Sequence, residues 1–277
     1  MNRSLQKHPP RNQPPAGGGA RPRTPDELDT DARNDADLLL CAASAEAPGT
    51  CGARRLAARL AWPPEGIGAP ALPPAVRWLS RERWPHCPGP ADRMAYLPPG
   101  AAGAILYLYR TPDGYLCAVD LEALTAEGNP MPERWRRTCG SKTGGYFAAT
   151  GKREGRDLLL CEGPVTALAL ALLYPEAEIR AVGGCGPLAR HGLEILRDIA
   201  PGSRLVRIMA DNDGPGLLAG RKGKALLRRA GHRVRLEWPD AHGDYADWLA
   251  ANVRAALESD GGNLRDAWDA VLPEAPF

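Results

Sequence analysis

The stretch "MADNDGPG", residues 209–216, places Asp211 and Asp213 after an apolar run and before a glycine-rich turn. The preceding run, "RLVRI", has the length and the branched apolar residues of a buried strand. Side chains two residues apart in a strand point to the same side, so Asp211 and Asp213 can face one site together. Aspartate, asparagine and glycine also favour turns, and taken alone the segment is better explained as a plain turn.

The chain around this stretch alternates between strand-like and helix-like patterns from residue 157 onward. Short apolar runs predict strands at 157–163, 178–186, 204–213 and 232–239. The segments between and after them predict helices at 164–174, 187–200, 215–231, 245–260 and 263–272. This order is typical of an α/β fold with a parallel sheet that is covered by helices on both faces.

Carboxylates follow two of these predicted strands. Glu162 ends the first strand, and Asp211 and Asp213 end the third. Ligands of parallel α/β sheets gather at the carboxyl ends of strands, so the three side chains form one cluster if the two strands are neighbours. Clustered carboxylates repel one another unless a cation neutralises them, and Mg²⁺ prefers oxygen ligands. Because Glu162 also follows a strand, the segment with Asp211 and Asp213 is better explained as part of a site for Mg²⁺ or Mn²⁺ than as a plain turn.

The chain before residue 155 has a different pattern. Residues 1–23 are rich in Pro, Gly and Arg without periodic apolar residues, which predicts a disordered tail. Thr24 begins a capping-box pattern, and helices are expected at 53–62 and 75–84. Trp78 and Trp84, in the second of these helices, are core residues or base-stacking platforms. Two apolar runs around "TPDG", residues 111–114, predict a β-hairpin.

A polar, basic loop is expected from 125 to 148. It carries Arg136, Arg137 and Lys142 close to paired glycines. Such a loop is either a solvated connection or a contact for phosphates, and the pattern favours neither. Lys222, on the third predicted helix of the α/β region, belongs to a basic face. The first interpretation of this face is a solvated surface, and the second is a contact for nucleic acid.

Composition excludes several classes of protein. The net charge is only +2, so any nucleic-acid contact must come from local patches. Seven cysteines without Cys-x-x-Cys spacing argue against a disulfide framework and against a zinc site, and favour reduced thiols in a cytoplasm. The longest apolar stretch, "VTALALALLY", is far too short for a membrane span. We therefore expect a cytoplasmic protein with no membrane partner.

The motifs "LLLCEGPVTALAL" and "RIMADNDGPG" together resemble the Toprim domain, which primases of the bacterial type share with topoisomerases and some nucleases. The resemblance covers roughly residues 155–250 and is greatest to the phage- and plasmid-type primases. In that group the Glu-Gly motif, a glycine-rich second strand end (here "AVGGCG") and Asp-Asn-Asp follow in this order. The resemblance implies a Toprim-like parallel sheet flanked by helices and preceded by a smaller α+β subdomain.

The resemblance also implies a division of the chain. A disordered tail would be followed by the primase-like subdomain, the Toprim domain and a helical extension. The expected ranges are 1–23, 24–154, 155–250 and 251–277.

By the same resemblance, Glu162 takes an acid/base or metal role, and Asp211 and Asp213 bind Mg²⁺. The late acidic motif "HGDYADWLA" adds Asp244 and Asp247 as further metal ligands. An alternative for these two is that acidic residues simply stabilise the first turn of a helix. The basic candidates for nucleotide and nucleic-acid binding are Arg136, Arg137, Lys142 and Lys222.

The function implied is a Mg²⁺-dependent nucleotidyltransferase that makes short RNA primers from ribonucleotides on single-stranded DNA. The sequence shows neither a zinc-binding module nor a Gly-x-x-x-x-Gly-Lys-Ser/Thr phosphate loop, so a separate helicase or zinc-bearing protein is the expected partner. Two alternatives remain: a Toprim-type metal-dependent nuclease and a non-catalytic module that binds nucleic acid or the replication machinery.

Overall fold

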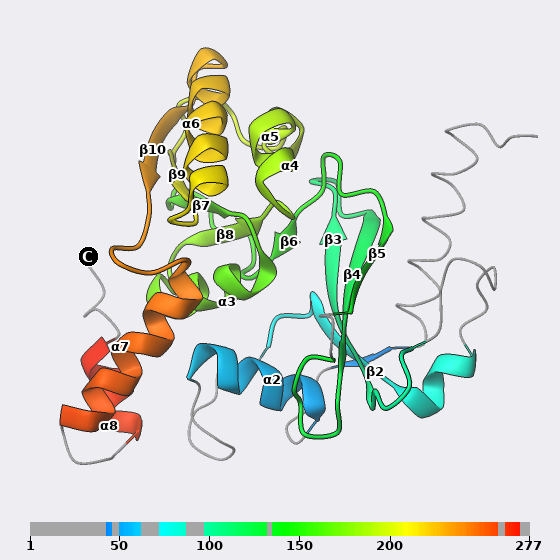
Figure 1. Ribbon diagram of the computed structural model, residues 1–277. Helices are drawn as coiled ribbons and strands as arrows, with labels where there is room; N and C mark the ends of the chain where they lie inside the picture. Colours follow the sequence, from blue (N-terminus) through cyan, green and yellow to red (C-terminus); the bar gives the residue numbers. More distant parts are fainter. Residues whose placement is uncertain are drawn as a thin grey trace, which may run out of the picture.

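The computed structural model describes residues 43–45, 50–61, 72–86, 97–131, 135–259 and 264–271. Its strands form two sheets of five strands each (Figure 1). The first five strands along the chain form one sheet, and the last five form the other. The tail expected at 1–23 and the helix start at Thr24 lie outside these residues. Within them, no helix is long and apolar enough to span a lipid bilayer.

The N-terminal sheet is antiparallel, in the order β1-β2-β3-β4-β5. Its strands are β1 (Ser44–Ala45), β2 (Val76–Ser80), β3 (Gly103–Arg110), β4 (Leu116–Leu124) and β5 (Arg136–Gly140). β3 and β4 are the predicted hairpin, which is confirmed. Nearly all side chains of β3 are buried, because this central strand is covered on both faces.

The helix expected at 75–84 is wrong. Residues 76–80 form β2, and a 3₁₀ helix, η1 (Arg81–His86), follows. This segment pairs with β3, and the pairing overrides its helical spacing. Val76 and Trp78 are buried in the core, whereas Arg77 between them is not, as the alternation of side chains in a strand requires. Trp78 is therefore a core residue, and Trp84 packs edge-on against Trp135.

The loop expected at 125–148 is wrong in part, because it contains β5 and β6 (Phe147–Ala148). β5 is an edge strand whose first three side chains are exposed, so its sequence lacks the apolar alternation that marks a buried strand. β6 joins the second sheet, so this sheet begins before the boundary expected at 154.

The second sheet has the order β10-β9-β7-β8-β6, with four parallel strands and the antiparallel edge strand β6. The parallel strands are β7 (Leu158–Cys161), β8 (Glu178–Ala181), β9 (Leu205–Met209) and β10 (Arg233–Glu237). The helices are α3 (Pro164–Leu173), α4 (Cys185–Arg190), α5 (Gly192–Ile195), α6 (Gly214–Arg229), α7 (Tyr245–Ser259) and α8 (Leu264–Val271). The predicted α/β fold is confirmed.

Two details of this half differ from expectation. The single helix expected at 187–200 is two short helices, α4 and α5, with His191 and Gly192 at the break, where glycine disfavours a continuous helix. α7 runs without interruption through residue 250, where a domain boundary was expected.

Helices cover both faces of the second sheet. Leu159 and Cys161 of β7 pack in one core with α3, α7 and α8, whereas Leu158 and Leu160 pack in another with α4, α5 and α6. This alternation follows from the opposite directions of successive side chains in a strand.

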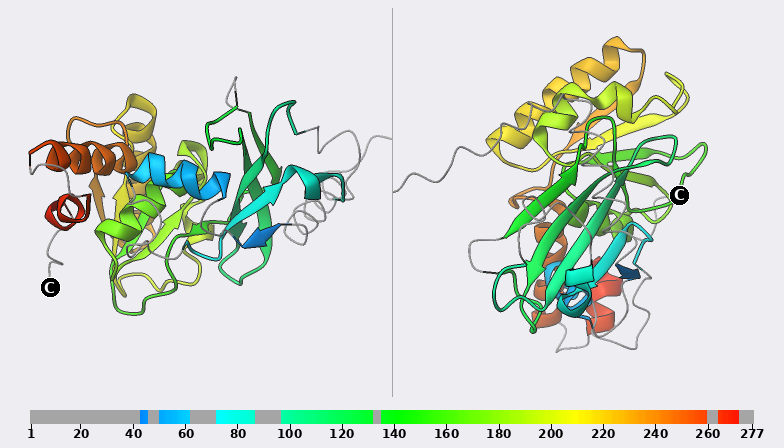
Figure 2. Two further views of the ribbon diagram at one scale, coloured as in Figure 1. Left: turned by 90° about the horizontal axis from the view of Figure 1, so that it is seen from below. Right: turned by 90° about the vertical axis from the view of Figure 1, so that its right-hand side faces the viewer.

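α2 (Cys51–Leu60) connects the two halves. Thr50 caps its start by accepting a hydrogen bond from the N–H of Ala53. Its buried residues Leu56 and Leu60 share one core with β3, α3 and α7. Figure 2 shows α2 between the antiparallel sheet and α7, and one core contains residues from both halves.

Arg180, on β8, is the largest fully buried side chain among the described residues. Its guanidinium forms ion pairs with Glu178 and Asp198, donates to the carbonyl of Ile195 and stacks on Tyr146. The network fixes β8 to the segment after α5. Burial raises the pKa of Asp198, but hydrogen bonds and charges from Arg180 and Lys152 outweigh burial and lower this pKa to about 2.

Replacement of Arg180 by methionine keeps the volume but leaves buried carboxylates without this partner. We expect Arg180→Met to lower the free energy of unfolding by about 3 kcal/mol, measured by urea denaturation. The matched control is Arg235→Met on the exposed side of β10, with a change below about 0.5 kcal/mol. Equal effects of the two substitutions would contradict the role assigned to Arg180.

Candidate active site

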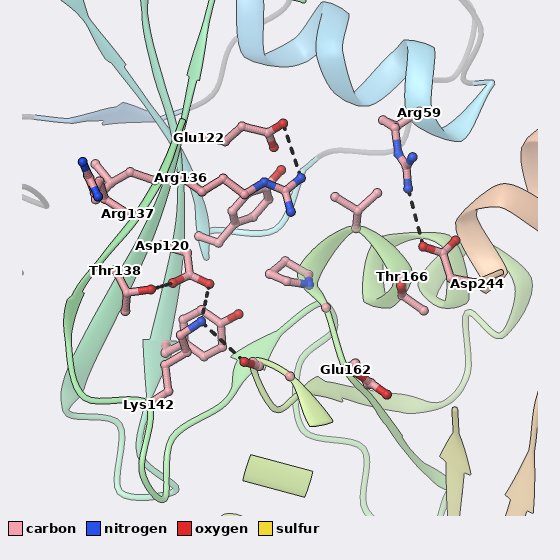
Figure 3. A pocket seen from close by; sticks show the side chains of 18 of the residues that line it. Arg59, Asp120, Glu122, Arg136, Arg137, Thr138, Lys142, Glu162, Thr166 and Asp244 are labelled. Carbon is pink, nitrogen blue, oxygen red and sulfur yellow. Dashed lines mark hydrogen bonds and ion pairs between the residues drawn. The ribbon is translucent and has the colours of Figure 1, made fainter. Parts of the chain in front are cut away.

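A cleft of about 440 Å³ lies between the two sheets (Figure 3). One wall consists of α2 and the strands β3, β4 and β5, and the other of the carboxyl ends of β7, β8 and β9 with the start of α3. Its ionisable lining residues are Arg55, Arg59, Tyr107, Tyr109, Asp120, Glu122, Arg136, Arg137, Lys142, Glu162, Asp211 and Asp244.

Glu162 and Asp211 come together because β7 and β9 are neighbours. In their parallel register Cys161 pairs with Met209, so the residues that follow lie at the same edge of the sheet. The sequence argument required these two strands to be neighbours, and this condition is met. Glu162 is only 7% exposed, and both its Oε1 and Oδ1 of Asp211 are buried without a hydrogen-bond partner among the described residues.

Asp213 lies beside this pair but has a local partner. It is the N-cap of α6, where its Oδ1 accepts a hydrogen bond of 2.6 Å from the N–H of Gly216. A Cβ on Gly216 would lie 3.0 Å from both Asp213 Oδ1 and Glu162 Oε1. The absence of a side chain at Gly216 therefore leaves room for these two carboxylates to approach each other.

Asp244 and Asp247 lie at the start of α7. This position agrees with the alternative interpretation of the sequence, in which the two residues stabilise the first turn of a helix. Asp244 Oδ1 accepts a hydrogen bond from the N–H of Asp247, the pattern of a helix N-cap. Both carboxylates also pair with Arg59 of α2, at 3.5 Å and 3.3 Å. Asp244 lines the cleft, and its charge reaches Asp211.

The carboxylates of this edge lie close enough together for their charges to affect one another. Burial, and after it the charges of Glu162, Asp244, Asp213 and Asp247, raise the pKa of Asp211 to about 7. Burial likewise raises the pKa of Glu162, against a hydrogen bond from Cys185 that lowers it. Burial, which favours the neutral carboxyl, is therefore the main cause of both shifts, and the neighbouring carboxylates add to it.

The donor set suits a hard divalent cation in chemistry and in charge, because unpartnered carboxylate oxygens are the ligands that Mg²⁺ prefers. Within the described part of the chain, no three Asp, Glu, His or Cys side chains are arranged to hold a metal ion as they stand. The carboxylates of Glu162, Asp211 and Asp213 would have to converge to bind one.

The opposite wall is basic. Three of the four cationic candidates from sequence, Arg136, Arg137 and Lys142, line the cleft. Lys142 Nζ lies 2.7 Å from Asp120 Oδ2 and also above the ring of Tyr109. The fourth candidate, Lys222, is exposed on α6 and is not a lining residue.

Sequence reasoning missed four charged residues of this wall. Arg55 and Arg59 lie one turn apart on α2, and Asp120 and Glu122 alternate with apolar residues in β4. Glu122, only 4% exposed, pairs with Arg55 and Arg136. Acidic residues in an otherwise apolar strand were the available signal, because buried carboxylates need partners.

The cleft therefore places an acidic edge opposite a wall of five cations. Arginine and lysine bind phosphate oxygens, and clustered carboxylates bind a divalent cation that itself binds phosphates. The charges of the two walls would suit a metal-bound polyphosphate if the carboxylates converged on the metal ion.

Neither a family model nor a curated protein matches the sequence. Among solved structures, the fold is similar to the primase fragment of the bacteriophage T7 primase-helicase protein, with 16% identity and a TM-score of 0.43. That match covers 58% of this chain and 64% of the T7 fragment, so the chain spans less than two thirds of the relative.

Two bacterial proteins are also similar. The E. coli primase catalytic core is 18% identical, with a TM-score of 0.38 over 62% of this chain and 52% of that one. The RNA polymerase domain of Mycobacterium tuberculosis primase, in complex with double-stranded DNA, is 20% identical, with a TM-score of 0.35 over 62% and 53%.

Substitution of Asp211 tests the repulsion at this edge. A carboxyl whose pKa is higher in the folded protein than in the unfolded chain, about 3.9, destabilises the fold as pH rises through its folded value. In metal-free protein we expect Asp211→Asn to increase the free energy of unfolding at pH 8 by about 1–2 kcal/mol, after a discount for solvent screening. This gain corresponds to a rise in Tm of roughly 3–6 °C. The gain should vanish near pH 4.

The control for this prediction is Asp240→Asn, at an exposed position after β10. Its Tm should follow that of the wild type at both pH values. A Tm of Asp211→Asn that is unchanged or lowered at pH 8 would show that Asp211 is not under electrostatic strain.

Proposed function

We propose that this chain is a metal-dependent nucleotidyltransferase of the primase type, which synthesises short RNA primers on single-stranded DNA during replication of a chromosome or mobile element. The observation that carries this proposal is the cleft, in which carboxylates at the ends of β7 and β9 face arginines and a lysine of the N-terminal half. The Toprim-like motif pair supplies the carboxylates, and the basic wall supplies cationic side chains for the phosphates of a nucleoside triphosphate.

In this proposal Glu162, Asp211 and Asp213 hold Mg²⁺ or Mn²⁺, and Asp244 and Asp247 are secondary ligands. The ion would supply Lewis-acid chemistry at a phosphoryl group. The unpartnered oxygens of Glu162 and Asp211 support the assignment, since a buried carboxylate oxygen without a donor is costly unless a cation binds it.

The basic wall binds phosphates in the same proposal. Lys142 lines the cleft, where its Nζ lies 3.5 Å from the carbonyl oxygen of Gly183, and in this proposal it would bind the triphosphate. Arg136 is 63% exposed and Arg137 is exposed, which suits contact with the backbone of a template strand. Arg55 lines the cleft, and its ion pair of 3.1 Å with Glu122 would hold the guanidinium in place for a ligand.

The reaction would be the transfer of a nucleotidyl group. The 3′-hydroxyl oxygen of one nucleotide forms a bond to the α-phosphorus of the next, and the bond to pyrophosphate breaks with its electron pair. The hydroxyl proton must leave as the bond forms. Glu162 Oε1, which accepts no hydrogen bond in the described structure, is our candidate for its first acceptor. A separate helicase or zinc-bearing replication protein would deliver the template.

Extension of a short RNA annealed to single-stranded DNA tests this function, because it bypasses template selection and initiation by other proteins. Purified chain with ribonucleotides and Mg²⁺ should extend the RNA, and chelation should abolish the product. Asp213→Ala should lower the rate at least about 100-fold, with Asp240→Ala as the control that keeps it.

Other outcomes of the same assay identify the alternatives. Metal-dependent cleavage of the DNA without nucleotides would indicate a nuclease. Tight binding of single-stranded DNA that is unaffected by chelator and by Asp211→Asn, without any product, would indicate a non-catalytic module. Either result would replace the primase proposal.

A matched lysine pair tests the basic wall. We expect Lys142→Ala to raise KM for ribonucleotides at least about 10-fold, because a charge-assisted contact to phosphate is lost. Lys222→Ala, on the exposed face of α6, should leave this KM within about 2-fold. Equal effects of the two substitutions would argue against nucleotide binding in the cleft.

A further inference from the structure

The turn after β8, "GGCG" at 183–186, holds Glu162 by its main chain. The N–H groups of Gly183 and Gly184 donate hydrogen bonds of 2.8 Å and 3.0 Å to the carbonyl oxygen of Glu162. These bonds continue the pairing of β7 with β8 beyond the last ladder residues, Cys161 and Ala181. Glu162 is therefore fixed to this turn at its backbone.

Both glycines are needed for this conformation. Gly183 has φ of +83° and Gly184 has φ of +127°, which L side chains rarely adopt. A Cβ on Gly183 would also lie 2.5 Å from Cδ of Lys142 and 3.1 Å from the ring of Tyr109. The paired glycines let the turn pass beneath the basic wall and begin α4 at Cys185, beside the acidic edge.

Cys185 makes the third contact with Glu162, now at its side chain. The Sγ–H group donates to Oε2 of Glu162 over 2.8 Å. The other oxygen, Oε1, is buried, has no partner among the described residues and points to the space that Gly216 leaves at the start of α6. The thiol therefore determines which carboxylate oxygen is occupied and which one is available.

We propose that Cys185 is a positioning residue for Glu162: its thiol holds Oε2 and presents Oε1 to the cation and the reacting groups. The inference rests on the proposed function, because it assumes that Glu162 serves the metal site. A hydrogen bond from an outer residue commonly orients a metal-binding side chain, and its loss typically costs 10–100-fold in metal affinity.

The test compares Cys185→Ala with Cys185→Ser in the full chain. Binding of Mn²⁺ alone, without nucleotides, is measured by electron paramagnetic resonance. We expect Cys185→Ala to raise the Kd for Mn²⁺ at least about 10-fold, and Cys185→Ser, which keeps a donor, to restore it to within about 3-fold. Cys139→Ala, on β5, is the control for loss of a thiol elsewhere.

Kinetics of RNA extension give a second measurement that a structural defect would not reproduce. Cys185→Ala should lower kcat and leave KM for ribonucleotides unchanged, since the phosphate-binding wall is intact. Thermal denaturation checks that the three variants keep the Tm of the wild type to within a few degrees.

The outcomes separate this inference from the proposed function. If the wild type binds Mn²⁺ and extends RNA, but Cys185→Ala binds Mn²⁺ like the wild type, only the role of Cys185 is overturned. If Cys185→Ala binds Mn²⁺ weakly and serine restores binding, but no protein extends RNA, only the nucleotidyltransferase proposal is overturned. If the wild type binds no Mn²⁺, both are overturned.

Discussion

Pairing of β7 with β9 brings Glu162 and Asp211 to one edge of the parallel sheet, and the rest of the candidate site depends on how their charges are balanced. Two carboxylates at a half-buried edge repel each other, and burial removes the water that would screen them. The pKa of Asp211, raised to about 7, expresses this cost. A bound cation would offset this cost, which is why we propose a cation site at this edge.

The other features of the cleft follow from the same constraint. The turn after β8 holds Glu162 by two main-chain hydrogen bonds and by Cys185, so the carboxylate is fixed before any ligand binds. Gly216 leaves space at the start of α6 for the carboxylates. α2 brings Arg59 to Asp244 and Asp247 and thus joins the basic wall to the acidic edge. Pre-organised charges of both signs across one cleft suit a metal-bound polyphosphate.

The sequence predicted the α/β half well, because short buried strands and the helices between them leave a strong apolar pattern. The clustering of Glu162 and Asp211 was predicted on the condition that their strands are neighbours, since ligands gather where parallel strands end. The local pattern misled at β2 and β5, whose pairing with distant strands decides their structure. Arg55, Arg59 and Cys185 were missed because their approach to the acidic edge depends on tertiary packing of α2 and on two glycines with positive φ.

Anomalous X-ray diffraction from crystals of the full chain grown with Mn²⁺ tests most directly whether this edge is a cation site. We predict one strong anomalous peak bounded by the carboxylates of Glu162, Asp211 and Asp213, and its loss in Asp211→Asn crystals grown in the same way. Well-ordered crystals with no peak at the ends of β7 and β9, or with Mn²⁺ bound only at other carboxylates, would contradict the account.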